Sequence, residues 1–136
     1  MKFEILERTE LAVRAVRLLA DLSRAPSHEL AERLGTSGGF LTQVLSPLVQ
    51  RGVLISTRGP GGGYRFAVPP STLTMLDIIE IIEGPTEDGR CVLEDAECPR
   101  IEPCSLHDAW IAARTSLTET LGRTPVLDTD TEETPR

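Results

Sequence analysis

A tight turn between two helical patterns constrains the fold of this chain more than any other feature. Ser27 can cap a short amphipathic helix that Gly35 ends. Ser37 can then cap another helix, in which apolar residues recur at helical spacing until Gly52. Two helices joined by such a turn are typical of a helix-turn-helix, whose later helix enters the DNA major groove.

The same spacing predicts a further helix before this unit. Apolar residues from Leu11 to Leu22 predict a first helix over residues 9–22. Pro47 lies inside the helix that follows Ser37, where its ring removes a backbone hydrogen bond and clashes with the preceding turn. We therefore expect a kink or an early end at Pro47.

A glycine-rich hairpin comes directly after the helix-turn-helix. Residues 53–57 and 64–68 have the composition of strands, and Arg58 to Gly63 lie between them. The glycines suit either a turn that needs positive φ or a loop that must lie close to a phosphate backbone. The chain lacks the Gly-Lys-Ser/Thr motif of phosphate-transfer loops. In this position the hairpin is typical of a wing, from which Arg58 would reach a DNA phosphate or the narrow minor groove.

Two more helices are expected in the second half of the chain. A capping-box pattern at Thr74 and Asp77 starts an apolar helix, and another at Ser105 and Asp108 starts a long C-terminal helix. Residues 86–103 between them are predicted to form a loop. The apolar stripe of the last helix consists of Leu106, Trp110, Ala113, Leu117 and Leu121. We expect this helix to pair with a copy of itself, because a palindromic DNA site requires a twofold dimer.

These elements predict a mainly α fold with a small β-hairpin wing, which is a winged helix-turn-helix followed by a long C-terminal dimerisation helix. The chain has 136 residues, enough for one main domain with an appendage. We expect a DNA-binding head over residues 1–70. Residues 71–121 are expected to form dimerisation helices and a loop, to which the cysteines described below assign cluster binding. Residues 122–136 are rich in Thr, Pro and acids, and are expected to form a disordered tail.

The charge divides along the same boundary. Residues 1–70 hold 9 Lys plus Arg against 6 Asp plus Glu, a net charge of +3. Residues 71–136 hold 5 against 15, a net charge of -10, which gives the total of -7. A basic head is compatible with binding to a polyanion. The N-terminus has no signal-peptide pattern and no long apolar run occurs, so we expect a cytoplasmic protein with no membrane partner.

All the cysteines fall in one short segment, at Cys91, Cys98 and Cys104, and His107 follows the last of them. Cysteines used only as buried apolar residues would be scattered, so the segment is interpreted as a ligand set. The gaps are wider than those of structural zinc knuckles and suit a larger iron-sulfur cluster. Zinc and free thiols are the alternatives. Six acidic residues in the loop disfavour bare thiolates, and these are Glu87, Asp88, Glu94, Asp95, Glu97 and Glu102.

Three thiolates leave one coordination position open. His107, at the start of the last helix, or a carboxylate from elsewhere could fill it. A ligand other than a thiolate tends to raise the reduction potential of the site and exchanges more easily, which suits a sensor. No paired acid and base, no nucleophile with a partner and no cofactor fold is found, so an enzyme is not expected.

The candidate DNA contacts lie on the helix after the tight turn and on the wing. Gln43 is the best candidate base reader, because an amide can form two hydrogen bonds with adenine. The candidates are Ser37, Gly38, Gly39, Thr42, Gln43 and Ser46 on the helix, and Arg58, Gly61, Gly62, Tyr64 and Arg65 on the wing. The hydroxyl of Ser37 has a second possible role as a helix cap.

The glycine hairpin behind a helix-turn-helix, followed by the three cysteines and His107, closely resembles the Rrf2 family of bacterial winged-helix regulators. The resemblance covers roughly residues 1–121. It implies a homodimeric transcription factor that binds a palindromic operator in double-stranded DNA. It also implies a 2Fe-2S or 4Fe-4S cluster whose gain, oxidation, nitrosylation or loss changes the affinity for DNA.

The resemblance also implies which residues hold the cluster. Cys91, Cys98 and Cys104 match the three cysteine ligands of the family. The fourth ligand is His107, as in some members, or Glu10 of the partner subunit, as in others. The sequence departs from the family pattern at Pro47, at Thr42, where other members carry an acid, and in the first cysteine gap, which is one residue longer than is common. The alternative functions are a zinc-stabilised or thiol-based regulator without a cluster, and a small electron-transfer iron-sulfur protein.

Overall fold

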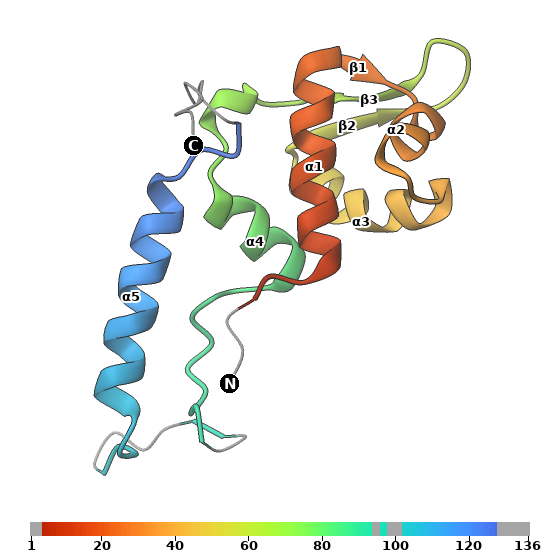
Figure 1. Cartoon of the computed structure of the whole chain (residues 1–136). Helices are drawn as coiled ribbons and strands as arrows, with labels where there is room; N and C mark the ends of the chain where they lie inside the picture. The colour runs from red at the N-terminus through yellow and green to blue at the C-terminus, as the bar shows by residue number, and fades with distance from the viewer. Residues whose placement is uncertain (1–3, 94–95, 98–101, 128–136) are drawn as a thin grey trace, which may run out of the picture.

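The computed structural model describes residues 4–93, 96–97 and 102–127. Three helices and a small sheet form the head, and two further helices follow it (Figure 1). In chain order the elements are α1 (Glu7–Leu22), β1 (Arg24–Ala25), α2 (Ser27–Leu34), α3 (Gly38–Gln50), β2 (Leu54–Thr57), β3 (Gly63–Phe66), the 3₁₀ turn η1 (Pro70–Thr72), α4 (Met75–Glu83) and α5 (His107–Arg123). The mainly helical fold with a β-hairpin wing is therefore confirmed.

The sheet has one more strand than the sequence predicted. Its order is β1-β3-β2, and both neighbouring pairs are antiparallel. The hairpin of β2 and β3 pairs Leu54 with Phe66 and Ser56 with Tyr64, and β1 adds Ala25 opposite Tyr64. The two residues of β1 are too few to show a strand period, so only their pairing with β3 defines them.

The core of the head is continuous through α1, α2, α3 and the sheet. Its fully buried large side chains include Leu19 of α1, Leu30 of α2, Leu41, Leu45 and Leu48 of α3, and Leu54 of β2. Burial of each such side chain contributes about 1.5–3 kcal/mol. The head thus has the core that its helical patterns predicted.

The helix boundaries confirm some of the expected caps and correct others. The side chain of Ser37 accepts a hydrogen bond from the backbone N–H of Phe40 at 3.1 Å, and Thr74 and Asp77 form the predicted capping box. Ser27 is not a cap, because α2 begins at Ser27 itself and Pro26 occupies the N-cap position. The capping box expected at Ser105 and Asp108 is wrong as well. A turn at Ser105 and Leu106 precedes α5, so the N-cap is Leu106 and has no side-chain cap.

Pro47 does not end α3, which continues to Gln50. The expectation of an early end was therefore wrong. Leu45 and Leu48 on either side of Pro47 are buried in the core. Their packing stabilises the helix although proline removes one of its backbone hydrogen bonds.

The segment after α5 returns to the head, which corrects the predicted start of the tail at residue 122. Helix α5 runs to Arg123, and the N–H of Met75 donates to the carbonyl of Thr124 at 2.8 Å. The N–H of Val126 donates to the carbonyl of Leu73 at 3.0 Å. The side chain of Val126 is 0% exposed. Residues 128–136, the rest of that predicted tail, lie outside the described residues.

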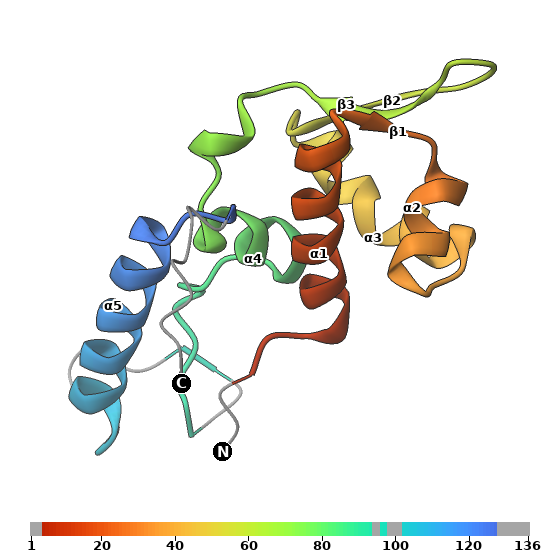
Figure 2. The ribbon, with the colours of Figure 1, turned by 45° about the horizontal axis from the view of Figure 1, so that its top comes forward.

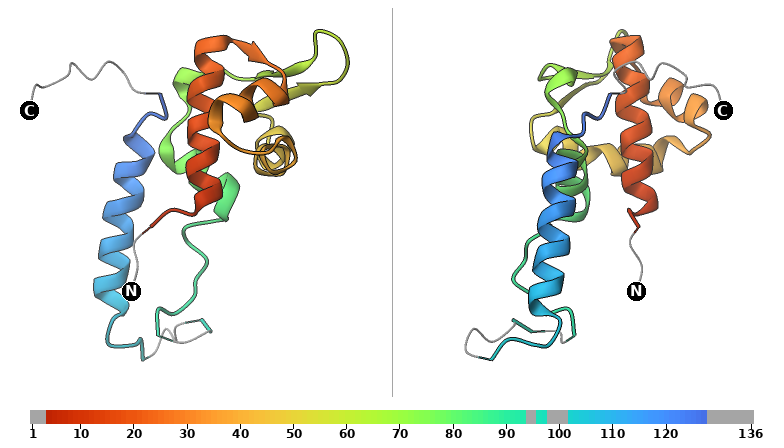
Figure 3. Two further views of the ribbon diagram at one scale, coloured as in Figure 1. Left: turned by 45° about the vertical axis from the view of Figure 1, so that its right-hand side comes forward. Right: turned by 60° about the vertical axis from the view of Figure 1, so that its left-hand side comes forward.

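Helix α4 lies between the head and α5 and contacts both α1 and α5 (Figure 2). The wing lies at one end of the molecule, and the cysteine loop lies at the other end with the N-terminal end of α5 (Figures 1 and 3). Within the described residues, no helix combines the length and the apolar character needed to cross a membrane.

Candidate nucleic-acid interface and cysteine cavity

Helix α3 buries one face and exposes the other. Leu41, Val44 and Leu45 pack into the core, while Gly39, Thr42 and Gln43 are exposed, and Ser46 is half-buried. The hydroxyl of Thr42 donates to the carbonyl of Gly38 at 2.8 Å, and the Nε2 atom of Gln50 donates to the hydroxyl of Ser46 at 3.4 Å. Gln43 is an exposed residue, as a base reader must be.

Close backbone contacts and positive φ values within the chain account for the glycines of the wing. A Cβ at Gly62 would collide with the carbonyl oxygen of Thr57, and a Cβ at Gly63 would collide with the carbonyl oxygen of Ala25. Gly59 and Gly61 have φ values of 87° and 73°, in the region that favours glycine. Of the two interpretations of these glycines, the tight turn is the one with structural support.

The wing residues differ in what they can contact. Arg58 and Arg65 are exposed, and so is Gly61, whereas Gly62 is half-buried. The side chain of Tyr64 is only 5% exposed and belongs to the core of the head. Tyr64 was expected among the DNA contacts. This expectation is corrected, because the alternation of β3 turns Tyr64 inward and Arg65 outward.

The net positive charge of the head is concentrated in the segment that includes α3 and the wing. Residues 33–76, which include α3 and the wing, contain Arg33, Arg51, Arg58 and Arg65 and no Asp or Glu. A surface with cations and no carboxylates attracts a phosphate backbone even in an acidic protein. Helix α3 and the wing therefore lie in one segment whose charged residues are all arginines.

The cysteine loop and α5 enclose a cavity of about 570 Å³. Cys91 and Cys104 from the loop and His107 from α5 line it together. Cys98 lies outside the described residues. The backbone N–H of Cys91 donates to the carbonyl of Ala96 at 2.7 Å, and the N–H of Leu93 donates to the Sγ atom of Cys91 at 3.4 Å. Three of the predicted ligands, Cys91, Cys104 and His107, therefore share one site.

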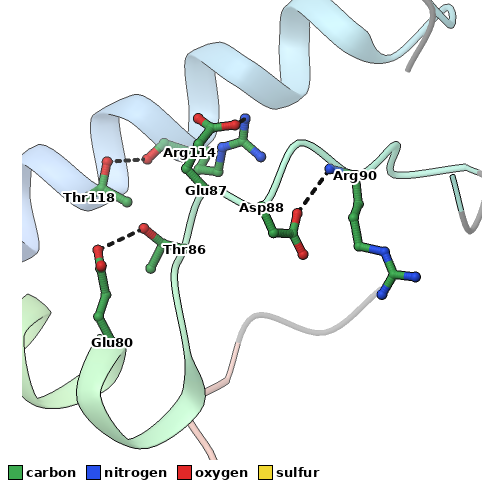
Figure 4. Close-up of polar contacts among 7 residues, drawn as sticks. All are labelled: Glu80, Thr86, Glu87, Asp88, Arg90, Arg114 and Thr118. Carbon is green, nitrogen blue, oxygen red and sulfur yellow. Dashed lines mark hydrogen bonds and ion pairs between the residues drawn. The ribbon is translucent and has the colours of Figure 1, made fainter. Parts of the chain in front are cut away.

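The cavity also contains two arginines that the sequence analysis did not include. Arg90 from the loop and Arg114 from α5 line it beside Trp110. The Nη2 atom of Arg114 lies 2.7 Å from the Oε1 atom of Glu87 (Figure 4). His107, Trp110 and Arg114 recur at helical spacing along one face of α5, which is the signal that could have identified them. These cations offset part of the negative charge of the loop.

The donor chemistry of the cavity fits an iron-sulfur cluster or another thiophilic metal, since two thiols and an imidazole face the same space. In the part of the chain that the structure describes, no three Cys, His, Asp or Glu residues are arranged to hold a metal ion. Glu10 does not line the cavity, and its Oε1 atom lies 3.7 Å from the Nε atom of Arg14 on α1. A contribution of Glu10 to such a site would have to come from another subunit.

A carboxylate connects the end of α4 to the start of α1. The hydroxyl of Thr9, which is 0% exposed, donates to the Oε2 atom of Glu83 at 2.6 Å. The N–H of Leu6 also points to this oxygen, at 3.4 Å. Leu6 is the N-cap of α1 and provides no side-chain cap. Glu83 therefore supplies an anion to the N-terminus of α1 from the last residue before the cysteine loop.

The helix-turn-helix, the exposed polar face of α3 and the wing with its exposed arginines define a winged helix-turn-helix protein that binds DNA. The chain belongs to the Rrf2 family, whose model is described as an iron-dependent transcriptional regulator and matches residues 5–129. The protein is thus a transcriptional regulator and not an enzyme.

Individual relatives agree with this assignment. The chain is 32% identical over 120 residues to protein aau3 of Rhizobium meliloti, covering 85% of this chain and 77% of that protein. It is 29% identical over 106 residues to the regulator IscR of Vibrio vulnificus, covering 78% of this chain and 62% of that protein. Among solved structures, CymR, the global cysteine regulator of B. subtilis, is similar with a TM-score of 0.74 and 26% identity, covering 92% of this chain and 94% of that chain.

Proposed function

We propose that the protein is a cytoplasmic, homodimeric regulator whose affinity for a palindromic operator is switched by an iron-sulfur cluster. Cys91, Cys98 and Cys104 would hold the cluster, with His107 or Glu10 of the partner subunit as the fourth ligand. The observation that carries the proposal is the cavity that Cys91, Cys104 and His107 line together, although they come from two different elements. Among the two candidate fourth ligands, the cavity favours His107.

A bound 2Fe-2S or 4Fe-4S cluster would supply a redox-active centre that reacts with oxidants or nitric oxide. The chain supplies the surroundings. The N–H of Leu93 donates to the sulfur of Cys91, and such bonds stabilise the charge of a thiolate. Arg90 and Arg114 line the same cavity and offset the negative charges of Glu87 and Glu97, which also line it. The hydrogen bond thus favours an anionic sulfur at Cys91, and the arginines limit the repulsion from the acidic side chains.

The exposed face of α5 supports the proposed dimer. The predicted apolar stripe is divided, because Trp110 and Leu121 turn inward while Leu106 and Leu117 are 44% and 50% exposed. Ala113 is also exposed and lies on the same line of the helix as Leu106 and Leu117. An apolar line of this kind on a long helix suits pairing with a second copy of α5.

The position of the loop supports a switch in DNA affinity. The loop joins α4, which contacts the head, to α5, the proposed dimer helix. The hydroxyl of Thr86 donates to Glu80 at 3.0 Å, and Arg114 pairs with Glu87, so the start of the loop is fixed to both helices (Figure 4). A change in loop conformation would therefore alter the angle between two heads that must fit half-sites about one helical turn apart.

A thiol-based regulator without a cluster is the second candidate. The similarity to CymR, a cysteine regulator, and the two cysteines in one cavity favour it. A zinc-stabilised regulator would use the same donors. Membership in a family of transcriptional regulators argues against the small electron-transfer protein.

The test uses full-length protein purified without oxygen and a duplex selected from a random-sequence library. Cluster binding predicts iron, acid-labile sulfide and visible absorption, together with a difference in affinity for the duplex between the loaded and the metal-free protein. Trp110 is the only tryptophan and lines the cavity, so its fluorescence should be quenched on loading.

Matched variants assign this signal to the cavity. Cys104→Ser should lose iron and absorption, while Ser105→Ala, at an exposed neighbouring position, should keep both. Iron-free wild-type protein after iron-replete, oxygen-free preparation, or equal DNA affinity with and without the cluster, would contradict the proposal. Colourless protein that contains zinc would support the zinc-stabilised candidate instead.

A further inference from the structure

Several exposed arginines of this protein have a carboxylate partner. Arg14 pairs with Glu10 and Arg33 with Glu29, in both cases one helical turn apart. Arg24 of β1 pairs with no carboxylate of the described residues, and the same holds for Arg58 and Arg65 of the wing. The sheet therefore contains a set of cations that the chain itself does not neutralise.

Two of these cations lie directly opposite each other. In the antiparallel pair of β1 and β3, Arg24 faces Arg65, and both side chains are exposed. Their neighbours Ala25 and Tyr64 point into the core. Like charges at directly opposed positions destabilise a sheet, so nothing in the folding of the head explains this pair.

The side chain of Arg24 extends toward the tip of the wing. Its Nη2 atom lies 3.0 Å from the point that a Cβ atom of Gly61 would occupy. Gly61 belongs to the turn that begins at Arg58. A Cβ atom at position 61 would displace the end of this flexible side chain only slightly. The guanidinium of Arg24 is thus added to the tip of the wing from outside the hairpin.

We infer that Arg24 is a phosphate-binding residue of the DNA interface and acts together with Arg58 and Arg65. The ligand is the phosphodiester backbone of duplex DNA, whose negative charge relieves the repulsion between the opposed arginines. This inference rests on the proposed DNA-binding function and adds a residue to it. Phosphate contacts position a protein on DNA without reading its sequence, so Arg24 should contribute equally to all duplexes.

The test compares full-length wild type with Arg24→Gln, Arg24→Lys and the control Arg123→Gln. Arg123 is exposed and is the last residue of α5, a helix that lies far from the wing (Figure 1). Arg123→Gln therefore removes the same charge at a distance from the wing. Affinity is measured by fluorescence anisotropy, for the selected duplex and for an unrelated duplex, over about 50 to 200 mM salt. Thermal unfolding of each variant shows whether it is folded.

Arg24→Gln should weaken binding to both duplexes by a similar factor. The slope of log affinity against log salt should fall by about 0.9 for each subunit that loses the contact. Arg24→Lys should keep the wild-type slope because it keeps the charge, and Arg123→Gln should behave as wild type.

Three results would overturn the inference. If wild type binds and Arg24→Gln has the same affinity and slope, Arg24 does not contact phosphate, and the proposed function stands. If Arg24→Gln and Arg24→Lys are equally weak with an unchanged slope, Arg24 only supports the wing. If wild type binds no duplex in a salt-dependent way, the proposed function fails and the inference fails with it.

Discussion

The head and the C-terminal unit, which consists of the cysteine loop and α5, achieve their order in different ways. The head encloses a core in which Leu19, Leu30 and Leu45 are almost completely buried. Helix α5 has 17 residues and none of them is buried. The loop that precedes it is acidic and connects to α5 through the partly exposed ion pair of Glu87 and Arg114. The head encloses an apolar core, to which Ile78 of α4 and Val126 also contribute, whereas the C-terminal unit exposes surfaces suited to another subunit and a cofactor.

The largest expected effect concerns the core of the head. Leu45→Ala leaves a cavity in the core and should lower the free energy of unfolding by about 2–5 kcal/mol. Leu117→Ala removes a half-exposed side chain and should change the unfolding of the monomer little. Urea unfolding of both variants measures the contrast. Equal losses would mean that α5 folds as part of the same core.

Removal of the link between α4 and α1 should have the next largest effect. Thr9→Val deletes the hydroxyl that donates to Glu83 and leaves the carboxylate without its shortest hydrogen bond. The free energy of unfolding should fall by about 1–3 kcal/mol. Thr120→Val is the control, because the hydroxyl of Thr120 only donates within α5, at 2.9 Å to Ser116. Equal stability of Thr9→Val and wild type would show that Glu83 does not hold α1.

A charge on the exposed line of α5 should separate the two copies without unfolding the head. Leu117→Asp is expected to weaken dimerisation at least about tenfold, which corresponds to about 1.4 kcal/mol. Ala112→Asp puts the same charge at an exposed position on a different side of α5. Sedimentation of both variants over a range of concentrations measures dimerisation. If both variants dimerise as wild type does, this line is not the dimer interface.

The smallest expected effect concerns the ion pair between the loop and α5. The side chain of Glu87 is 68% exposed and that of Arg114 is 14% exposed, so solvent screens much of their attraction. A double-mutant cycle with Glu87→Gln and Arg114→Gln should give a coupling energy below about 1 kcal/mol. The pair of Glu29 and Arg33 on α2 is the reference. A coupling well above this range would mean that the chain alone makes the loop rigid.

The features that could be predicted from the sequence depend on nearby residues. The cap at Ser37, the capping box at Thr74 and Asp77, and the hairpin of β2 and β3 all have signals within a few positions. The cap expected at Ser105 failed because a turn moves the helix start to His107. Nearby residues can show that a helix begins in a segment, but one additional turn can shift its first residue.

Contacts between distant segments were not predictable in the same way. Arg24 reaches the wing only because β1 pairs with β3, and Arg114 lines the cavity only because α5 turns that face toward the loop. The hydrogen bond between Thr9 and Glu83 joins residues 74 positions apart. Predicting such pairs requires knowledge of how distant elements are placed relative to each other. The sequence of either element alone does not give this placement.

The anchoring of the chain after α5 determines how this helix can move. Sliding of α5 along its axis would pull Val126 from its buried site and break the hydrogen bonds of Thr124 and Val126 to Met75 and Leu73. The Nε atom of Arg17, which donates to the carbonyl of Val126 at 2.8 Å, opposes the same displacement. A tilt about this anchored end keeps all of these contacts. The end of α5 near His107, about 25 Å away along the 17-residue helix, is then the part that travels furthest.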